Sequence, residues 1–281
     1  MIKFGPSGNC ETFYMAGFKR SVEAPKFLSS VGLNAYEYSF GRGITLGDET
    51  AMEIGKEAKK YNIQVSVHAP YYINFATPTD EMAEKSYMYV INSLHKLKLL
   101  GGNRLVVHTA SCGKMERSQA VDLAKKRLLI LKDKLKENGY SDMLICLETM
   151  GKPAQIGDYK EVIDFCKLSP NYVPTFDFGH INALSHGSLK SEEDYRVIIK
   201  YLINELGMEK AKLLHIHFSK IEYGEKGEIR HLTLEDTKYG PEFAPLAKVL
   251  KEFNLEPTII CESNGVMAKD ALTLKSIYEA V

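Results

Sequence analysis

Short runs rich in β-branched and aromatic residues alternate with longer amphipathic segments along the whole chain. Eight runs are predicted to be strands: Ile2–Gly5, Ala35–Phe40, Gln64–His68, Arg104–His108, Met143–Glu148, Val173–Phe178, Lys212–Phe218 and Thr258–Glu262. Apolar residues recur at helical spacing between them, as in Met82–Leu100, Gln119–Glu137, Glu192–Leu206, Glu242–Phe253 and Lys269–Ala280. This alternation indicates parallel strands joined by crossover helices. Eight such units predict an α/β chain that forms a (β/α)8 TIM barrel, as one domain over residues 1–281.

The charge balance gives no overall attraction to polyanions. Lys+Arg and Asp+Glu both number 36, so DNA or an anionic membrane would have to meet a local basic patch. The five cysteines are scattered and include no C-x-x-C pair, which argues against a disulfide framework or a thiolate zinc cluster. The chain shows no signal-peptide pattern and no apolar run of about 18 residues. We therefore expect a cytoplasmic protein, monomeric, with no membrane partner.

Potential metal ligands stand at the ends of most predicted strands, where a barrel carries its chemistry. They are His68, His108, Glu148, Asp177 with nearby His180, His215 with His217, and Glu262, and His231 follows in the segment after the seventh strand. Any one of them would more often bond a backbone group or cap a helix. Independent capping roles do not explain potential ligands at five consecutive strand ends and again at the eighth.

The types of these residues indicate the metal and the chemistry. Imidazole and carboxylate ligands without thiolate suit zinc, with manganese as an alternative. Nine candidate groups can hold two or three ions if a carboxylate bridges them. Closely spaced cations stabilise displacement at phosphorus, which points to phosphoester hydrolysis.

The ordered motifs resemble those of the endonuclease IV family, zinc-dependent apurinic/apyrimidinic (AP) endonucleases among the xylose-isomerase-like barrels. They are HAPYYIN, VVHTAS, CLETMG, TFDFGHINA, HIHFSK, RH and CES. The resemblance implies a hydrolase that cuts double-stranded DNA on the 5′ side of abasic sites in base excision repair. It also implies three ligand sets: His68, His108 and Glu148 for a first zinc; Glu148, Asp177, His215 and Glu262 for a second; His180 and His231 for a third. Glu148, shared by two sets, is the predicted catalytic residue.

Two positions depart from the family pattern. The family has an Asp two residues before the histidine that corresponds to His231, and this chain has Ile229 there. Glu228 would substitute for that Asp if the loop carries a one-residue insertion. His217 replaces a family Asn, and we expect it to be an extra ligand or a residue that supports one, since it shares a strand face with His215.

Candidate DNA contacts lie in the loops beside these strand ends. Tyr71 and Tyr72 resemble the family's intercalating loop, and Arg42 and Lys114 are placed to meet phosphates. The alternative is that the tyrosines only cover the barrel mouth and the basic residues are solvated.

Two other functions remain open at this point. Glu148, Asp177, His215 and Glu262 alone would make the single-metal site of a sugar isomerase or ketose epimerase on the same scaffold. That interpretation leaves the other four metal-ligand histidines unexplained as a set. The second is a metal-bound barrel that recognises damaged DNA without cutting it.

Overall fold

The main sheet is a closed parallel barrel of eight strands. The computed structural model describes residues 1–41 and 43–281. The strands follow the order β1-β12-β9-β8-β6-β4-β3-β2, and a parallel bridge between Ser7 and Glu37 joins the two outer strands. Their bounds are β1 Lys3–Pro6, β2 Ala35–Ser39, β3 Gln64–His68, β4 Arg104–His108, β6 Leu144–Glu148, β8 Tyr172–Asp177, β9 His215–Phe218 and β12 Thr258–Cys261. The predicted (β/α)8 barrel is confirmed.

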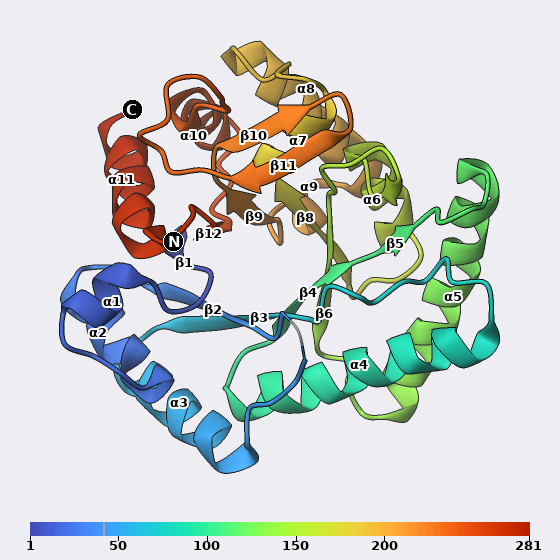
Figure 1. Ribbon diagram of the computed structural model, residues 1–281, viewed down its shortest axis with the longest axis horizontal. Coiled ribbons are helices and arrows are strands. Elements are labelled where there is room, and N and C mark those ends of the chain that lie inside the picture. The colour runs from blue at the N-terminus through green and yellow to red at the C-terminus, as the bar shows by residue number, and fades with distance from the viewer. Residues whose placement is uncertain (42) are drawn as a thin grey trace.

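Helices form an outer ring around the strands (Figure 1). They are α1 Glu11–Met15, the 3-10 turn η1 Ser21–Glu23, α2 Ala24–Ser30, α3 Asp48–Lys60, α4 Asp80–Leu99, α5 Arg117–Glu137, α6 Tyr159–Cys166, α7 Phe178–Leu184, α8 Glu192–Leu206, α9 Met208–Ala211, α10 Phe243–Glu252 and α11 Met267–Ala280. The five predicted helices agree with α4, α5, α8, α10 and α11 to within two residues at each end. In α4, Val90, Leu94 and Leu97 are buried because their helical spacing puts them on the face toward the strands.

The joint between β1 and β2 depends on a glycine. A Cβ atom on Gly5 would overlap the backbone carbonyl of Ala35. The absent side chain lets the two strands approach closely. Asn34 completes the joint, because its Oδ1 accepts a 2.8 Å hydrogen bond from the backbone nitrogen of Phe4.

Two short antiparallel hairpins are built from loops beyond the barrel strands. One pairs β10 (Ile221–Gly224) with β11 (Gly227–His231), and Figure 1 shows it in orange in front of β8 and β9. The other pairs β5 (Ala110–Ser111) with β7 (Gln155–Ile156). Both follow strands that end in predicted site residues, so they build the walls around the strand ends.

Across the described part of the chain, no helix is both long enough and apolar enough to span a membrane. All five cysteines are buried free thiols.

Candidate metal centre

Strands β3, β4 and β6 bring the first group of ligand atoms together, here called the His68 group: His68, His108 and Glu148. The Nε2 atoms of the two histidines lie 3.1 and 3.0 Å from Oε2 of Glu148. The register explains the meeting, since His108 pairs directly with Glu148 across β4 and β6. These three residues are grouped as the sequence predicted.

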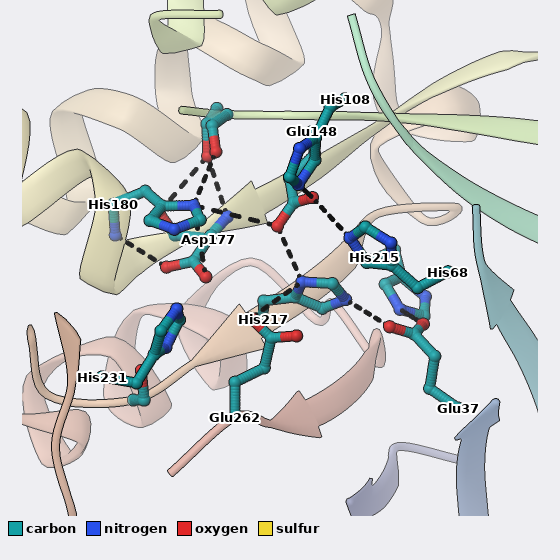
Figure 2. A network of polar contacts seen from close by, with 12 residues as sticks. Glu37, His68, His108, Glu148, Asp177, His180, His215, His217, His231 and Glu262 are labelled. Atoms are coloured by element: carbon teal, nitrogen blue, oxygen red, sulfur yellow. Dashed lines mark hydrogen bonds and ion pairs between the residues drawn. The ribbon is translucent and has the colours of Figure 1, made fainter. Parts of the chain in front are cut away.

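The second group, here called the His217 group, contains Glu148, Asp177, His217 and Glu262. Nδ1 of His217 lies 2.8 Å from Oε1 of Glu148 and 3.5 Å from Oε2 of Glu262. Glu148 therefore belongs to both groups and turns a different oxygen to each (Figure 2).

His217 lies in this group and His215 does not, whereas the family resemblance implied His215 for this set. Both histidines point into the barrel because they are two residues apart on β9. The register sets His217 level with Asp177 and His215 level with Thr175. His215 thus lies two residues, roughly 7 Å, deeper along the strand. Its Nε2 contacts Oε2 of Glu37 at 3.1 Å instead.

The third group, here called the His180 group, contains His180, Glu228 and His231. Nε2 of His180 lies 3.5 Å from Oε2 of Glu228, and Nε2 of His231 lies 3.9 Å from its Oε1. The pairing of β10 with β11 passes from Glu222↔Arg230 to Tyr223↔Glu228, so it skips Ile229. This β-bulge places one extra residue in β11. It leaves Ile229 57% exposed and turns Glu228 toward the two histidines.

Gly151 makes room for the His180 group. A Cβ atom there would lie 2.8 Å from Cβ of Glu228 and 2.9 Å from Cδ2 of His180. Its carbonyl also accepts a 2.9 Å hydrogen bond from the backbone nitrogen of Glu228. The loop after β6 thus fixes the hairpin against the site.

Three histidines are oriented through their Nδ1 atoms. Nδ1 lies 2.7 Å from the carbonyl oxygen of Ala69 for His68 and 2.9 Å from that of Thr149 for His180. Nδ1 of His231 lies 2.8 Å from the hydroxyl of Ser219. A carbonyl only accepts, so Nδ1 donates there and Nε2 is left facing the carboxylates.

Asp177 has two functions, one for each oxygen. Oδ1 accepts a 2.7 Å hydrogen bond from the backbone nitrogen of His180 and caps α7. Oδ2 is buried and has no hydrogen-bond partner among the described residues, although Nδ1 of His180 lies 3.4 Å away. A buried carboxylate oxygen without a hydrogen bond is costly unless a cation or proton meets it. This atom, together with imidazole and carboxylate donors, fits a divalent cation such as zinc or manganese.

Buried charges shift the pKa values of the centre. Burial opposes the charged form of each group, but the carboxylate of Glu148 outweighs it and raises the pKa of His68 to about 9. The carboxylates of Asp177 and Glu228 likewise outweigh the effect of burial and raise the pKa of His180 to about 9. Burial favours a neutral Glu148, yet His217 and His108 hold its pKa well below the ordinary value. The metal-free centre therefore carries paired imidazolium and carboxylate charges near neutral pH.

The zinc-induced gain in thermal stability is expected to grow as pH rises from 6.5 to 9. In the metal-free protein, the raised pKa values of His68 and His180 contribute stability that is complete below pH 6.5 and lost as pH rises through about 9. Zinc requires deprotonated imidazole, so its binding strengthens over the same interval. Burial lowers the pKa of His215 to about 4, so this histidine changes the stability of the protein only below pH 6.5. The prediction is checked by measuring the thermal unfolding midpoint with and without stoichiometric zinc at each pH. A difference between the two midpoints that becomes smaller as pH rises would contradict it.

Glu37 is a buried member of the centre that sequence reasoning did not identify. It is 0% exposed in β2, and its Oε1 lies 2.9 Å from Nε2 of His217. A single acidic residue inside the predicted strand Ala35–Phe40 was the available signal, because a charge buried in a strand requires a partner.

An open cavity of about 350 Å³ gives access to the three groups. Tyr71 lines it, whereas Tyr72 is 40% exposed and packs edge-on against Tyr89 at a ring-centroid distance of 4.8 Å. Lys114 is exposed and lies outside the described lining of this cavity, and Arg42 lies outside the residues that the structure describes. Lys152 and Gln155 also line this cavity, although they were not among the predicted site residues. The available signal was their position in the loop after a predicted strand end. A hollow of about 440 Å³ against α6–α8 contains none of the grouped residues, so we place the site in the smaller cavity.

The sequence comparisons cover from 65% to 95% of the chain. A family model described as "Xylose isomerase-like TIM barrel" matches residues 25–277. The chain is 34% identical over 272 residues to "Uncharacterized protein MJ0133" of Methanocaldococcus jannaschii, covering 95% of this chain and 96% of that one. It is 27% identical over 190 residues to a "Probable endonuclease 4" of Ureaplasma urealyticum serovar 10, which is 65% of this chain and 59% of that protein.

The structural comparisons find both kinds of enzyme on this scaffold. A D-tagatose 3-epimerase-like protein superposes with a TM-score of 0.74 at 19% identity, over 99% of this chain and 96% of that one. Endonuclease IV from Thermus thermophilus superposes with a TM-score of 0.71 at 18% identity, over 99% of this chain and 100% of that one. At such identities the likeness concerns the fold alone.

Proposed function

The chain belongs to the xylose isomerase-like TIM barrel family, and we propose that it is a zinc-dependent AP endonuclease. Its substrate is double-stranded DNA with an abasic site, and it hydrolyses the phosphodiester on the 5′ side of that site in base excision repair. Manganese is the alternative cation. The five free thiols support the proposal of a cytoplasmic protein, and we propose that it acts as a monomer.

The observation that carries this proposal is the presence of three ligand groups around one cavity. The His68, His217 and His180 groups all line or adjoin it. A single-metal reaction would use the His217 group and leave His68, His108, His180 and His231 without a function. Two or three cations close together suit a phosphodiester, because both the attacking and the leaving oxygen develop charge.

The protein's own contribution is to hold two cation positions through one carboxylate. We propose that Glu148 is the central catalytic residue, with Oε2 serving the His68 group and Oε1 serving the His217 group. Bound cations would supply Lewis-acid stabilisation at phosphorus and would ease the ionisation of water. His180, Glu228 and His231 would hold a third cation. In this assignment His217 replaces His215 as a ligand.

The cavity wall suggests how DNA is held. Tyr71 is 56% exposed at the rim and offers an aromatic face beside the extruded sugar. Lys152 lines the same cavity and would meet a phosphate. Tyr72, Arg42 and Lys114 remain proposed contacts farther along the duplex.

A duplex carrying one tetrahydrofuran abasic analogue tests the proposal. The zinc-loaded protein is expected to cut on the 5′ side of the analogue, to leave a 3′-hydroxyl, and to spare the undamaged duplex of the same sequence. Binding without cutting in either zinc or manganese would instead select a damage-recognition protein.

A single-metal ketose epimerase is the second candidate. The four-ligand His217 group and the superposition on a D-tagatose 3-epimerase-like protein favour it. In that reaction the carboxylates of the group would move protons on a keto-sugar. Interconversion of keto-sugars by a protein with one ion per chain, together with an uncut abasic duplex, would select it.

A further inference from the structure

A buried row of four side chains leads from the centre into the barrel core. From the cavity inward they are Glu148, His217, Glu37 and His215, and none is more than 1% exposed (Figure 2). Carboxylate and imidazole alternate along the row. Each imidazole thus has a carboxylate beside it in a region that water does not reach.

His217 lies between two carboxylates and turns one ring nitrogen to each. Nδ1 lies 2.8 Å from Oε1 of Glu148, and Nε2 lies 2.9 Å from Oε1 of Glu37. The second contact is an ion pair, and neither of its two atoms has a hydrogen-bond partner among the described residues. A neutral imidazole carries its proton on one nitrogen only, so a proton on Nε2 leaves the Nδ1 lone pair facing Glu148 and Glu262.

Glu37 is itself held in place. Its Oε2 accepts a 2.8 Å hydrogen bond from the hydroxyl of Ser66 and lies 3.1 Å from Nε2 of His215. Ser66 is on β3 and His215 is on β9, so the carboxylate is tied to strands on two sides of the barrel. Its other oxygen remains directed at His217.

His217 differs from the other oriented histidines of the centre. His68 and His180 bond backbone carbonyls through Nδ1, and His231 contacts a hydroxyl. Nδ1 of His180 also lies 3.4 Å from Oδ2 of Asp177. Among these four histidines of the described residues, His217 alone turns Nδ1 rather than Nε2 to its group, with the carboxylate of Glu37 2.9 Å from its Nε2. A carboxylate behind a metal-binding histidine fixes the tautomer and makes the ligand more basic.

We propose that Glu37 is a positioning residue that holds the proton of His217 on Nε2, so that Nδ1 binds a cation together with Glu148, Asp177 and Glu262. This inference rests on the proposed metal-dependent function. It holds for either reaction, because the nuclease and the epimerase both use the His217 group.

The inner trio of Glu37, His215 and His217 also brings three ligand atoms together. An ion there would compete with the contacts that Ser66 and His215 already make to Glu37. It would also take Nε2 of His217, in a place where all three ligands are 0% exposed. Binding of an ion by this trio is therefore an outcome against the proposal.

Zinc binding by the Glu37→Gln variant tests the role of the charge, since glutamine preserves the volume. Chelator competition is expected to show one ion bound about 10- to 100-fold more weakly than in the wild type. Ser66→Ala is the matched control, because it removes a hydrogen bond to the same carboxylate but leaves the charge, and its affinity is expected to stay close to wild type. Circular dichroism of the metal-free variants checks the fold.

Nitrogen-15 NMR of the histidines in the zinc-loaded wild type gives a result that needs no variant. Nδ1 of His217 is expected to bind the metal while Nε2 carries the proton, and metal on Nε2 would overturn the inference. Unchanged zinc affinity in Glu37→Gln, with an ion lost in His217→Gln, would also overturn it while leaving the metal-dependent function intact. An additional ion that disappears in His215→Gln would assign the inner trio as a site. Absence of zinc binding by the wild type would remove the proposed function as well.

Discussion

Replacing Glu148 with glutamine is expected to abolish incision of the abasic duplex, by roughly 10³-fold or more, and to release at least one ion per chain. The side chain of Glu148 belongs to two groups, because its Oε2 lies 3.1 Å from Nε2 of His68 and its Oε1 lies 2.8 Å from Nδ1 of His217. The amide has no negative charge, and its NH₂ presents donors where a cation needs an acceptor. Loss of several kcal/mol of transition-state stabilisation corresponds to a rate factor of about this size.

The measurements for this variant are single-turnover cleavage and metal content. Glu225→Gln is the matched control, because Glu225 is exposed in the turn between β10 and β11 and the change in charge is the same. Its activity and metal content are expected to equal those of the wild type. Full cleavage by Glu148→Gln would contradict the mechanism.

The second large effect separates the two histidines of β9. His217→Gln is expected to lose one ion per chain and at least about 100-fold in cleavage, because it removes a ligand atom from the His217 group. His215→Gln is expected to retain all its ions and most of its activity, since His215 contacts Glu37 and lies level with Thr175. This substitution is expected mainly to lower the free energy of unfolding, because it alters the buried hydrogen bond between His215 and Glu37.

His217→Gln and His215→Gln make the same chemical change at two positions of β9. Comparing them therefore tests how the position of a histidine along the strand affects metal binding. Metal content by element-resolved mass spectrometry and incision rates would be measured on both variants, after thermal unfolding has shown that each is folded. Loss of an ion in His215→Gln but not in His217→Gln would restore the assignment that the family motif implied.

The barrel and the first ligand group were predictable because they depend on local patterns. Alternating runs determined the strands, the rule that chemistry gathers at carboxyl ends of strands selected His68, His108 and Glu148 among the candidates, and the family resemblance grouped these three. The group formed as expected because the register sets His108 beside Glu148.

The choice between His215 and His217 required the register between strands. Both residues alternate to the same inner face, and no local pattern states which one is level with Asp177. The motif resemblance pointed to His215, two residues too deep along β9.

Glu228 and Glu37 required contacts that are distant in sequence. The bulge at Ile229 exists only in the pairing of β10 with β11, and it brings Glu228, the predicted substitute for the missing family Asp, beside His180 and His231. Glu37 lies 178 positions from His215 along the chain, and only closure of the barrel between β1 and β2 brings it into the centre.

The number of ions bound per chain distinguishes a multi-metal centre from a single-metal one. The protein would be reconstituted with zinc, freed of excess metal, and measured by element-resolved mass spectrometry against its amino-acid content. Three ligand groups, two of which share Glu148, predict two or three ions per chain. A single ion per chain, with the same number bound when manganese replaces zinc, would contradict the multi-metal centre and favour the single-metal epimerase.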